Sequence, residues 1–266
     1  MYSWYIDATA DNWHALISND YQTVFPVTFS NKLKIRQFIQ PIFSRQFEVI
    51  GDDFALTDAI NFIKKNFNLI HFKSSQSLND IKVTQSIKQH QYIDLTNTVK
   101  YSNNAKRLIK KANQIYTFKL ISNINDFIDI VKLTLSQKIK EFNPKTIENL
   151  KQLMLSAMQH QKGECIGIFE NNLIVGGGFF LTDKSTVTYL KGASTDKSKK
   201  NGAMYGLINF AINSYQSQYT IFDFGGSNIN NVATFYKKFG ALNNSYYEYK
   251  IGNTPFWFQT LKKLKP

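Results

Sequence analysis

Cysteine is almost absent from this chain of 266 residues, which excludes an internal disulfide framework. The one thiol belongs to Cys165, inside the apolar run of residues 165–169, a pattern typical of a buried strand. We therefore interpret Cys165 as a packing residue and not as a nucleophile.

Metal-binding and nucleotide-binding motifs are missing as well. The chain has no G-x-S-x-G elbow, no Walker A motif and no G-x-G-x-x-G turn that opens a helix. The histidines are isolated, without the spacing of metal ligands; they are His14, His71, His90 and His160. We expect no metal cofactor and interpret each histidine as a surface or packing residue.

Long apolar runs are also lacking. No stretch approaches the roughly 20 apolar residues of a membrane span. The first residues show neither the charged nor the apolar segment of a signal peptide. The sequence therefore predicts a cytoplasmic protein without a transmembrane segment.

Acidic residues are scarce beside basic ones, since 19 Asp and Glu face 32 Lys and Arg and the net charge is +13. Such a basic protein attracts nucleic acid, nucleotides, phosphorylated substrates or an anionic membrane, although a lysine-rich surface can also have no partner. Aromatic residues are plentiful, with 22 Phe and 14 Tyr to fill a core. The length suits two domains of roughly 100–150 residues each.

Hydrophobic periodicity predicts a mixed α/β chain. In the first hundred residues we expect strands at about 2–10, 21–29, 35–39 and 69–72, a helix capped by Asp11, and a helix at 58–66. Further on we expect helices at 101–116, at 125–140 and from Pro144, with Asn143 as N-cap. A β meander over 165–190 follows, then a helix at 202–215, a strand at 219–224, a helix at 232–239 and a strand at 246–251.

Two basic segments are candidates for binding phosphate. The helix at 101–116 carries Arg107 and Lys111 on the arc opposite its apolar residues, which indicates either a solvated face or a phosphate-contacting surface. The second segment precedes the helix at 202–215, where free amide groups and the helix dipole favour an anion. Its residues are Lys199, Lys200, Asn201, Gly202 and Ala203.

These features together resemble the GNAT acyltransferases. That family grips the pyrophosphate of acetyl-CoA with (Arg/Gln)-x-x-Gly-x-(Gly/Ala), which residues 199–204 match in the basic start and in Gly202, while Met204 replaces the last small residue. A second family motif, Tyr-x-x-x-Gly, is matched by residues 236–240. The resemblance implies that acyl-CoA binds at 199–203 and that Tyr236 is the general acid; alternatively Tyr236 is a core aromatic residue.

A narrower resemblance is to the Fem-type aminoacyltransferases, tandem-GNAT proteins that use aminoacyl-tRNA to modify peptidoglycan precursors. It rests on Asp-Phe-Gly-Gly at 223–226, on Phe-Tyr-Lys-Lys-Phe-Gly at 235–240 and on the helix at 101–112. Fem enzymes commonly have lysine where this chain has Tyr236. The resemblance implies two GNAT-like halves, each with a mixed, mostly antiparallel sheet flanked by helices. The degenerate half would span 1–117, and 118–266 would carry the donor site.

The resemblance implies transfer of an acyl or aminoacyl group from acyl-CoA or aminoacyl-tRNA to an amine, such as an anionic or cell-wall-precursor-like acceptor. Asp223 would orient the amine or take its proton, unless it only caps the following turn. Lys191, Arg107 and Lys111 would hold the acceptor, and Gly176–Gly178 would offer backbone contacts or only relieve crowding. The alternative is a non-catalytic nucleic-acid or ligand-binding protein on a degenerate GNAT scaffold.

Overall fold

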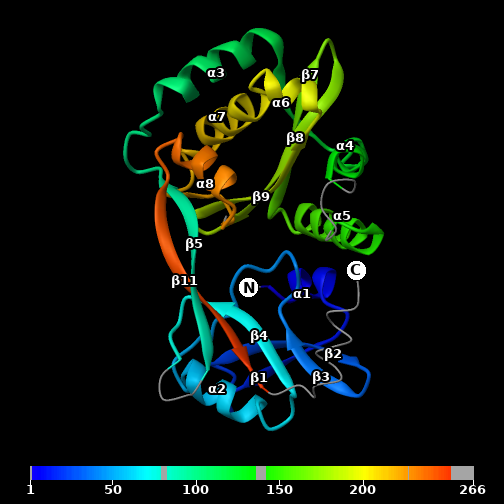
Figure 1. The fold of residues 1–266 in the computed structure, drawn as a ribbon, viewed down its shortest axis with the longest axis vertical. Helices are drawn as coiled ribbons and strands as arrows, with labels where there is room; N and C mark the ends of the chain where they lie inside the picture. Colours follow the sequence, from blue (N-terminus) through cyan, green and yellow to red (C-terminus); the bar gives the residue numbers. More distant parts are fainter. Residues whose placement is uncertain (1, 79–82, 136–141, 227, 253–266) are drawn as a thin grey trace. The chain divides into compact units, whose positions relative to one another are not determined.

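A computed structural model of the chain describes residues 2–78, 83–135, 142–226 and 228–252 (Figure 1). It confirms the predicted mixed α/β class, with mostly antiparallel strands flanked by helices. The described residues form two compact units: one within 1–88 and 245–266, the other within 89–244. This division differs from the expected boundary between residues 117 and 118, and the two GNAT-like halves stay a prediction.

The first unit contains a sheet in the order β1-β2-β3-β4-β11, antiparallel except for the β3–β4 pair. A two-residue turn at Leu33 and Lys34, both with positive φ, joins β2 to β3. The bounds are α1 (Ser3–Thr9), β1 (Trp13–Ile17), β2 (Val24–Lys32), β3 (Ile35–Ile39), α2 (Leu56–Ile63), β4 (Leu69–Ser74) and β11 (Leu242–Ile251).

Aromatic rings in edge-on and stacked contacts fill the core of this unit. Phe38 packs against Phe25, Phe47 and Phe72, with ring centroids 5.4–6.0 Å apart, and Phe72 contacts the buried Tyr249 of β11. Burial of this aromatic surface stabilises the unit, together with the aliphatic side chains packed around it.

Two assignments near the start of the chain are wrong. Residues 2–10 were expected to form a strand, but they contain helix α1, which buries Ile6 and Thr9 on one face. The helix expected after Asp11 is strand β1, since Trp13–Ile17 pairs in antiparallel register with β2. Pairing with β2, between residues 7 to 15 positions apart, overrides the local helix signal.

The second unit contains the strand order β5-β10-β9-β8-β7-β6, antiparallel except for the β9–β10 pair. The predicted meander is β7–β9, and Asn143 caps α5 through the amide of Thr146, as expected. The bounds are β5 (Thr84–Asp94), α3 (Asn103–Ile115), β6 (Thr117–Ile121), α4 (Asn125–Leu135), α5 (Pro144–Gln159), β7 (Gly163–Glu170), β8 (Leu173–Asp183), β9 (Thr186–Ser194), α6 (Asp196–Lys200), α7 (Ala203–Tyr215), β10 (Ile221–Asp223) and α8 (Asn230–Lys237).

Helices α4 and α7 cover opposite faces of β8, and glycines allow both to come close. A Cβ atom added to Gly177 would lie 2.9 Å from Phe127 of α4, and one added to Gly178 would lie 2.9 Å from Leu207 of α7. Both glycines pair with β7 on one side and with β9 on the other. Crowding therefore explains these glycines, and their backbones pair with both neighbouring strands.

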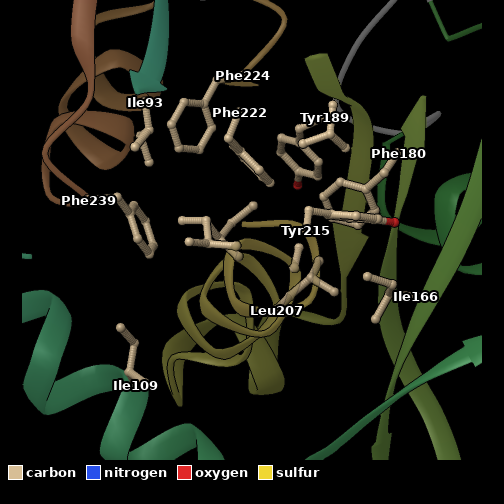
Figure 2. Close-up of a cluster of buried hydrophobic side chains, with 14 of the residues drawn as sticks. Ile93, Ile109, Ile166, Phe180, Tyr189, Leu207, Tyr215, Phe222, Phe224 and Phe239 are labelled. Carbon is tan, nitrogen blue, oxygen red and sulfur yellow. The ribbon is translucent and has the colours of Figure 1, made fainter. Parts of the chain in front are cut away.

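The core of this unit lies between α7 and the strands. Figure 2 shows Phe180, Tyr189, Tyr215, Phe222 and Phe224 gathered around the helix that carries Leu207. All of these side chains are buried. The aromatic cluster continues to the end of β10.

The tight packing at Gly178 predicts a coupled response to mutation. Gly178→Ala should cost about 1–3 kcal/mol, because the new methyl group overlaps Leu207. Leu207→Ala alone should cost about 2–5 kcal/mol. The double variant should be more stable than the sum of the two effects predicts, by about 0.5 kcal/mol or more, in urea denaturation followed by circular dichroism. Strict additivity would show that the two residues do not meet.

Candidate functional site

The strands β9 and β10 part after only three residue pairs. Their parallel pairing ends at Thr188 and Asp223, whereas β9 continues to Ser194 against β8 alone. Beyond Asp223 the chain stays with β5 through Phe224, whose amide donates to the carbonyl of Gln91, and then turns at Gly225 with φ +75°. Beyond Thr188, the edge of β9 that faced β10 therefore has no described strand paired to it, and this stretch begins beside Asp223 at the end of β10.

Asp223 is buried at the end of β10. One carboxylate oxygen accepts a hydrogen bond of 2.8 Å from the amide of Gly225, so the residue does cap the turn. The other oxygen lies 4.0 Å from Nε2 of His90. The turn thus uses one oxygen, while the second faces an ionisable side chain.

Tyr236 of α8 lies next to Asp223. Its ring stacks on Phe224 with centroids 4.2 Å apart and meets the ring of Tyr189 edge-on. Burial raises the pKa of Tyr236 well above the ordinary tyrosine value, and the negative charge of Asp223 makes a smaller contribution in the same direction. The structure therefore brings together the two side chains expected to be catalytic, and the phenol keeps its proton at neutral pH.

The sequence did not indicate His90 as a site residue. It lies on β5, a strand that polar residues such as Gln85 and Lys88 concealed from the periodicity. The side chain of His90 is 10% exposed. A Cβ atom added to Gly226 would lie 3.3 Å from the Cβ atom of His90. The one sequence signal for this contact was the pair Gly225 and Gly226, whose positive φ angles let the turn after β10 pass directly over His90.

The expected donor loop contains the short helix α6 before α7 begins. Lys199 and Lys200 are exposed on α6, and the amide groups of Asn201 and Gly202 are used within this turn. Gly202 adopts φ +84° and leaves no room for a side chain beside the carbonyl of Leu108. The first turn of α7 begins at Ala203, and the amide of Tyr205 in that turn donates to the carbonyl of Gly202.

Lys111 lies with this loop. Its ammonium group donates a 2.9 Å hydrogen bond to Oδ1 of Asn201, which connects α3 to the segment before α7. Arg107 is exposed one turn earlier on the same helix. The contact associates Lys111 with the residues proposed for the donor, although the sequence had grouped it with the acceptor.

Met204 extends from the first turn of α7 to β9. A Cβ atom on Gly192 would lie 2.8 Å from Cε of Met204. It would also overlap the hydroxyl group of Tyr189, which lies against the position that this Cβ atom would take. The bulge at Leu190 explains this, since it places Tyr189 and Gly192 on the same face. Met204 and the hydroxyl group of Tyr189 therefore fill the space beside Gly192.

No family model matches the chain, and no curated protein matches it. Solved structures do: L-PGS from Bacillus licheniformis is 14% identical and covers 97% of this chain and 93% of its own, with a TM-score of 0.63. FemX is 12% identical, covers 96% and 90%, and has a TM-score of 0.58. A tandem GNAT protein from the clavulanic acid biosynthesis pathway is 8% identical, covers 92% and 85%, and has a TM-score of 0.54.

The chain has a GNAT/Fem-like fold. At these identities the similarity concerns the fold, and the chemistry must be argued from the side chains. Within the described part of this GNAT/Fem-like chain, no three His, Cys, Asp or Glu residues gather as a metal site would require. Among the helices described, none has the length and apolar character to cross a membrane.

Lys191 lies apart from the other candidates in this GNAT/Fem-like fold. It precedes Gly192 on β9 and so faces the opposite side of the strand. Its Nζ atom lies 4.0 Å from the centre of the Phe142 ring, just before α5. Burial lowers the pKa of Lys191 to about 8. The structure does not bring Lys191 together with Tyr236.

A titration can test the environment of Lys191. In protein labelled with ¹³C-lysine, its amine should titrate near pH 8, and Lys191→Arg would assign the signal. Phe142→Ala should move the pKa upward, because water then reaches the ammonium group. Phe169→Ala, which removes a ring from β7, should leave the titration of Lys191 unchanged. A wild-type pKa in the ordinary lysine range of about 10.4 would contradict the burial.

Proposed function

We propose that the chain transfers an activated acyl or aminoacyl group to an amine beside the end of β10. The observation that supports this most strongly is the meeting of Asp223 and Tyr236, one ionisable acid and one protonated phenol, where β9 and β10 part. Amide formation from an activated carbonyl needs both a proton acceptor and a proton donor. The GNAT/Fem-like fold makes this reaction class the natural expectation.

Most of the candidate residues have a role in this proposal. Asp223 orients the amine and accepts its proton as the nitrogen attacks the carbonyl carbon. Tyr236 protonates the leaving group as its bond to that carbon breaks. The first-turn amides of α7, together with Lys199, Lys200 and Lys111, hold the anionic part of the donor. Lys191 has no role in this proposal, because it packs against Phe142 on the other face of β9.

Two observations favour an oxygen ester, such as aminoacyl-tRNA, over acyl-CoA as the donor. A departing thiolate has an ordinary pKa of about 8.5 and needs little help, whereas an alkoxide is strongly basic. A phenol whose pKa is raised by burial matches an alkoxide. In addition, Met204 and Tyr189 fill the space beside Gly192, next to the first turn of α7, which leaves less room there for coenzyme A. Acetyl-CoA is the second donor of the proposal.

The basic surface of α3 fits the same donor. Its exposed residues lie on one helix, and Lys111 joins them to the segment before α7; they are Lys106, Arg107, Lys110 and Lys111. Contacts of this kind with phosphates contribute affinity that falls steeply with salt concentration. We therefore expect the donor to be an RNA-linked ester held along α3.

One observation favours a second function. Asp223 caps the turn at Gly225, and Tyr236 is stacked within the core, so both can be purely structural. The chain would then bind a nucleic acid or another anionic ligand without catalysis. Such a protein would bind RNA in a salt-dependent way and form no product.

Turnover distinguishes these functions. Purified protein should transfer the aminoacyl group of bulk aminoacylated tRNA to a panel of amines, with acetyl-CoA as the competing donor. Tyr236→Phe should lower kcat by about 100-fold or more, because the leaving group loses its proton donor. Tyr219→Phe, a hydroxyl removed elsewhere in the same unit, should leave kcat unchanged.

The outcomes separate clearly. Equal turnover in Tyr236→Phe and the wild type would remove Tyr236 from the mechanism. Salt-dependent tRNA binding without any product would establish the non-catalytic alternative.

A further inference from the structure

His90 and Asp223 form a nearly buried pair. The mechanism proposed above uses Asp223 but gives His90 no role. Their side chains are 10% and 9% exposed, and Nε2 lies 4.0 Å from Oδ2. They come from the neighbouring strands β5 and β10, where Asp223 is opposite Tyr92. His90 is two residues before Tyr92, so it lies just beyond the last residue of β10. A buried carboxylate beside an imidazole is an arrangement that favours proton transfer.

The turn after β10 holds this pair in place. Gly225 and Gly226 have φ of +75° and +92°, a conformation that other residues adopt at a cost. A Cβ atom on Gly225 would lie 3.0 Å from the carbonyl oxygen of Tyr189, and one on Gly226 would lie 3.3 Å from His90. The turn is therefore packed between His90 and the edge of β9, and it fixes one oxygen of Asp223 through the Gly225 amide.

Several ionisable groups surround Asp223, and only one of them ordinarily titrates near neutral pH. Tyr236 faces it from α8, and Tyr189 of β9 lies behind Tyr236. From β5 come His90 and, beside the imidazole, Tyr92. Burial raises the pKa of Tyr189 and Tyr236 further above neutrality. Imidazole is the side chain whose charge ordinarily changes between pH 5 and 8.

We propose that His90 is a positioning residue that receives, through Asp223, the proton of the attacking amine. This inference rests on the function proposed above. The amine enters as R–NH₂, its lone pair forms the new C–N bond, and one N–H proton passes to Asp223 and on to Nε2 of His90. The C–O bond of the ester breaks, and its electron pair leaves with the oxygen, which takes the proton of Tyr236. The imidazolium then returns its proton through Asp223 to Tyr236.

The observed distance places a condition on this step. At 4.0 Å the two atoms are beyond hydrogen-bond range, so they must approach by about 1 Å or share a bridging water. Catalytic hydrogen bonds commonly tighten in this way once substrate is bound. Because neutral imidazole is the proton acceptor, activity is lost as the pH falls and His90 becomes protonated.

The pH profile of kcat/KM tests the proposal. His90→Gln keeps a polar side chain but cannot titrate, so it should lower kcat/KM by about 100-fold and abolish the acidic limb of the profile. His160→Gln, at the exposed end of α5, should keep both the rate and the limb. An acidic limb that persists in His90→Gln, or an unchanged rate, would overturn the proposal.

A second measurement needs neither turnover nor a folded His90 variant. The imidazole of His90 is titrated by ¹⁵N NMR in the wild type and in Asp223→Asn. Loss of the neighbouring negative charge should lower the pKa of His90 in the variant. An identical pKa in both proteins would overturn the pairing, even if the proposed transfer is observed. A clear shift without any transfer would instead support the pairing and count against the proposed function.

Discussion

Close packing of α7 against the strands β8 and β9 is the constraint on which the second unit depends. Glycines permit it at two places, Gly178 under Leu207 and Gly192 under Met204, and Gly206 of the helix itself lets Phe118 of β6 come close. With α7 held so near to the sheet, its first turn lies beside β9 and its apolar face meets the aromatic cluster. Crowding therefore explains Gly178, Gly192 and Gly206.

The site follows from this packing and from the short pairing of β9 with β10. Because β10 ends at Asp223, the carboxylate is placed where the two strands separate. The cluster around Phe224 then sets Tyr236 next to that carboxylate and excludes water from both. Exclusion of water raises the pKa of the phenol, which suits proton donation to a strongly basic leaving group. Local strand geometry and aromatic burial together account for the chemistry that we propose.

The sequence predicted elements with strong local signals and missed those set by distant contacts. The meander and α5 with its Asn143 cap were visible as periodicity and as a capping motif, and Asp223 and Tyr236 were each named as candidates from the motifs. Strand β1 was not, since its identity depends on pairing with β2. His90 was missed because β5 carries too many polar residues to show alternation, and a lone histidine gives no signal of its partner on another strand.

The most direct test of the account concerns the filled space beside Gly192. Coenzyme A is titrated calorimetrically into the wild type, into Met204→Ala and into Met158→Ala, a matched loss on α5. The account predicts negligible binding to the wild type and to Met158→Ala, and a gain of at least about tenfold in Met204→Ala, or about 1.4 kcal/mol. Tight binding of coenzyme A to the wild type, unaffected by Met204→Ala, would contradict the account and make acyl-CoA the donor.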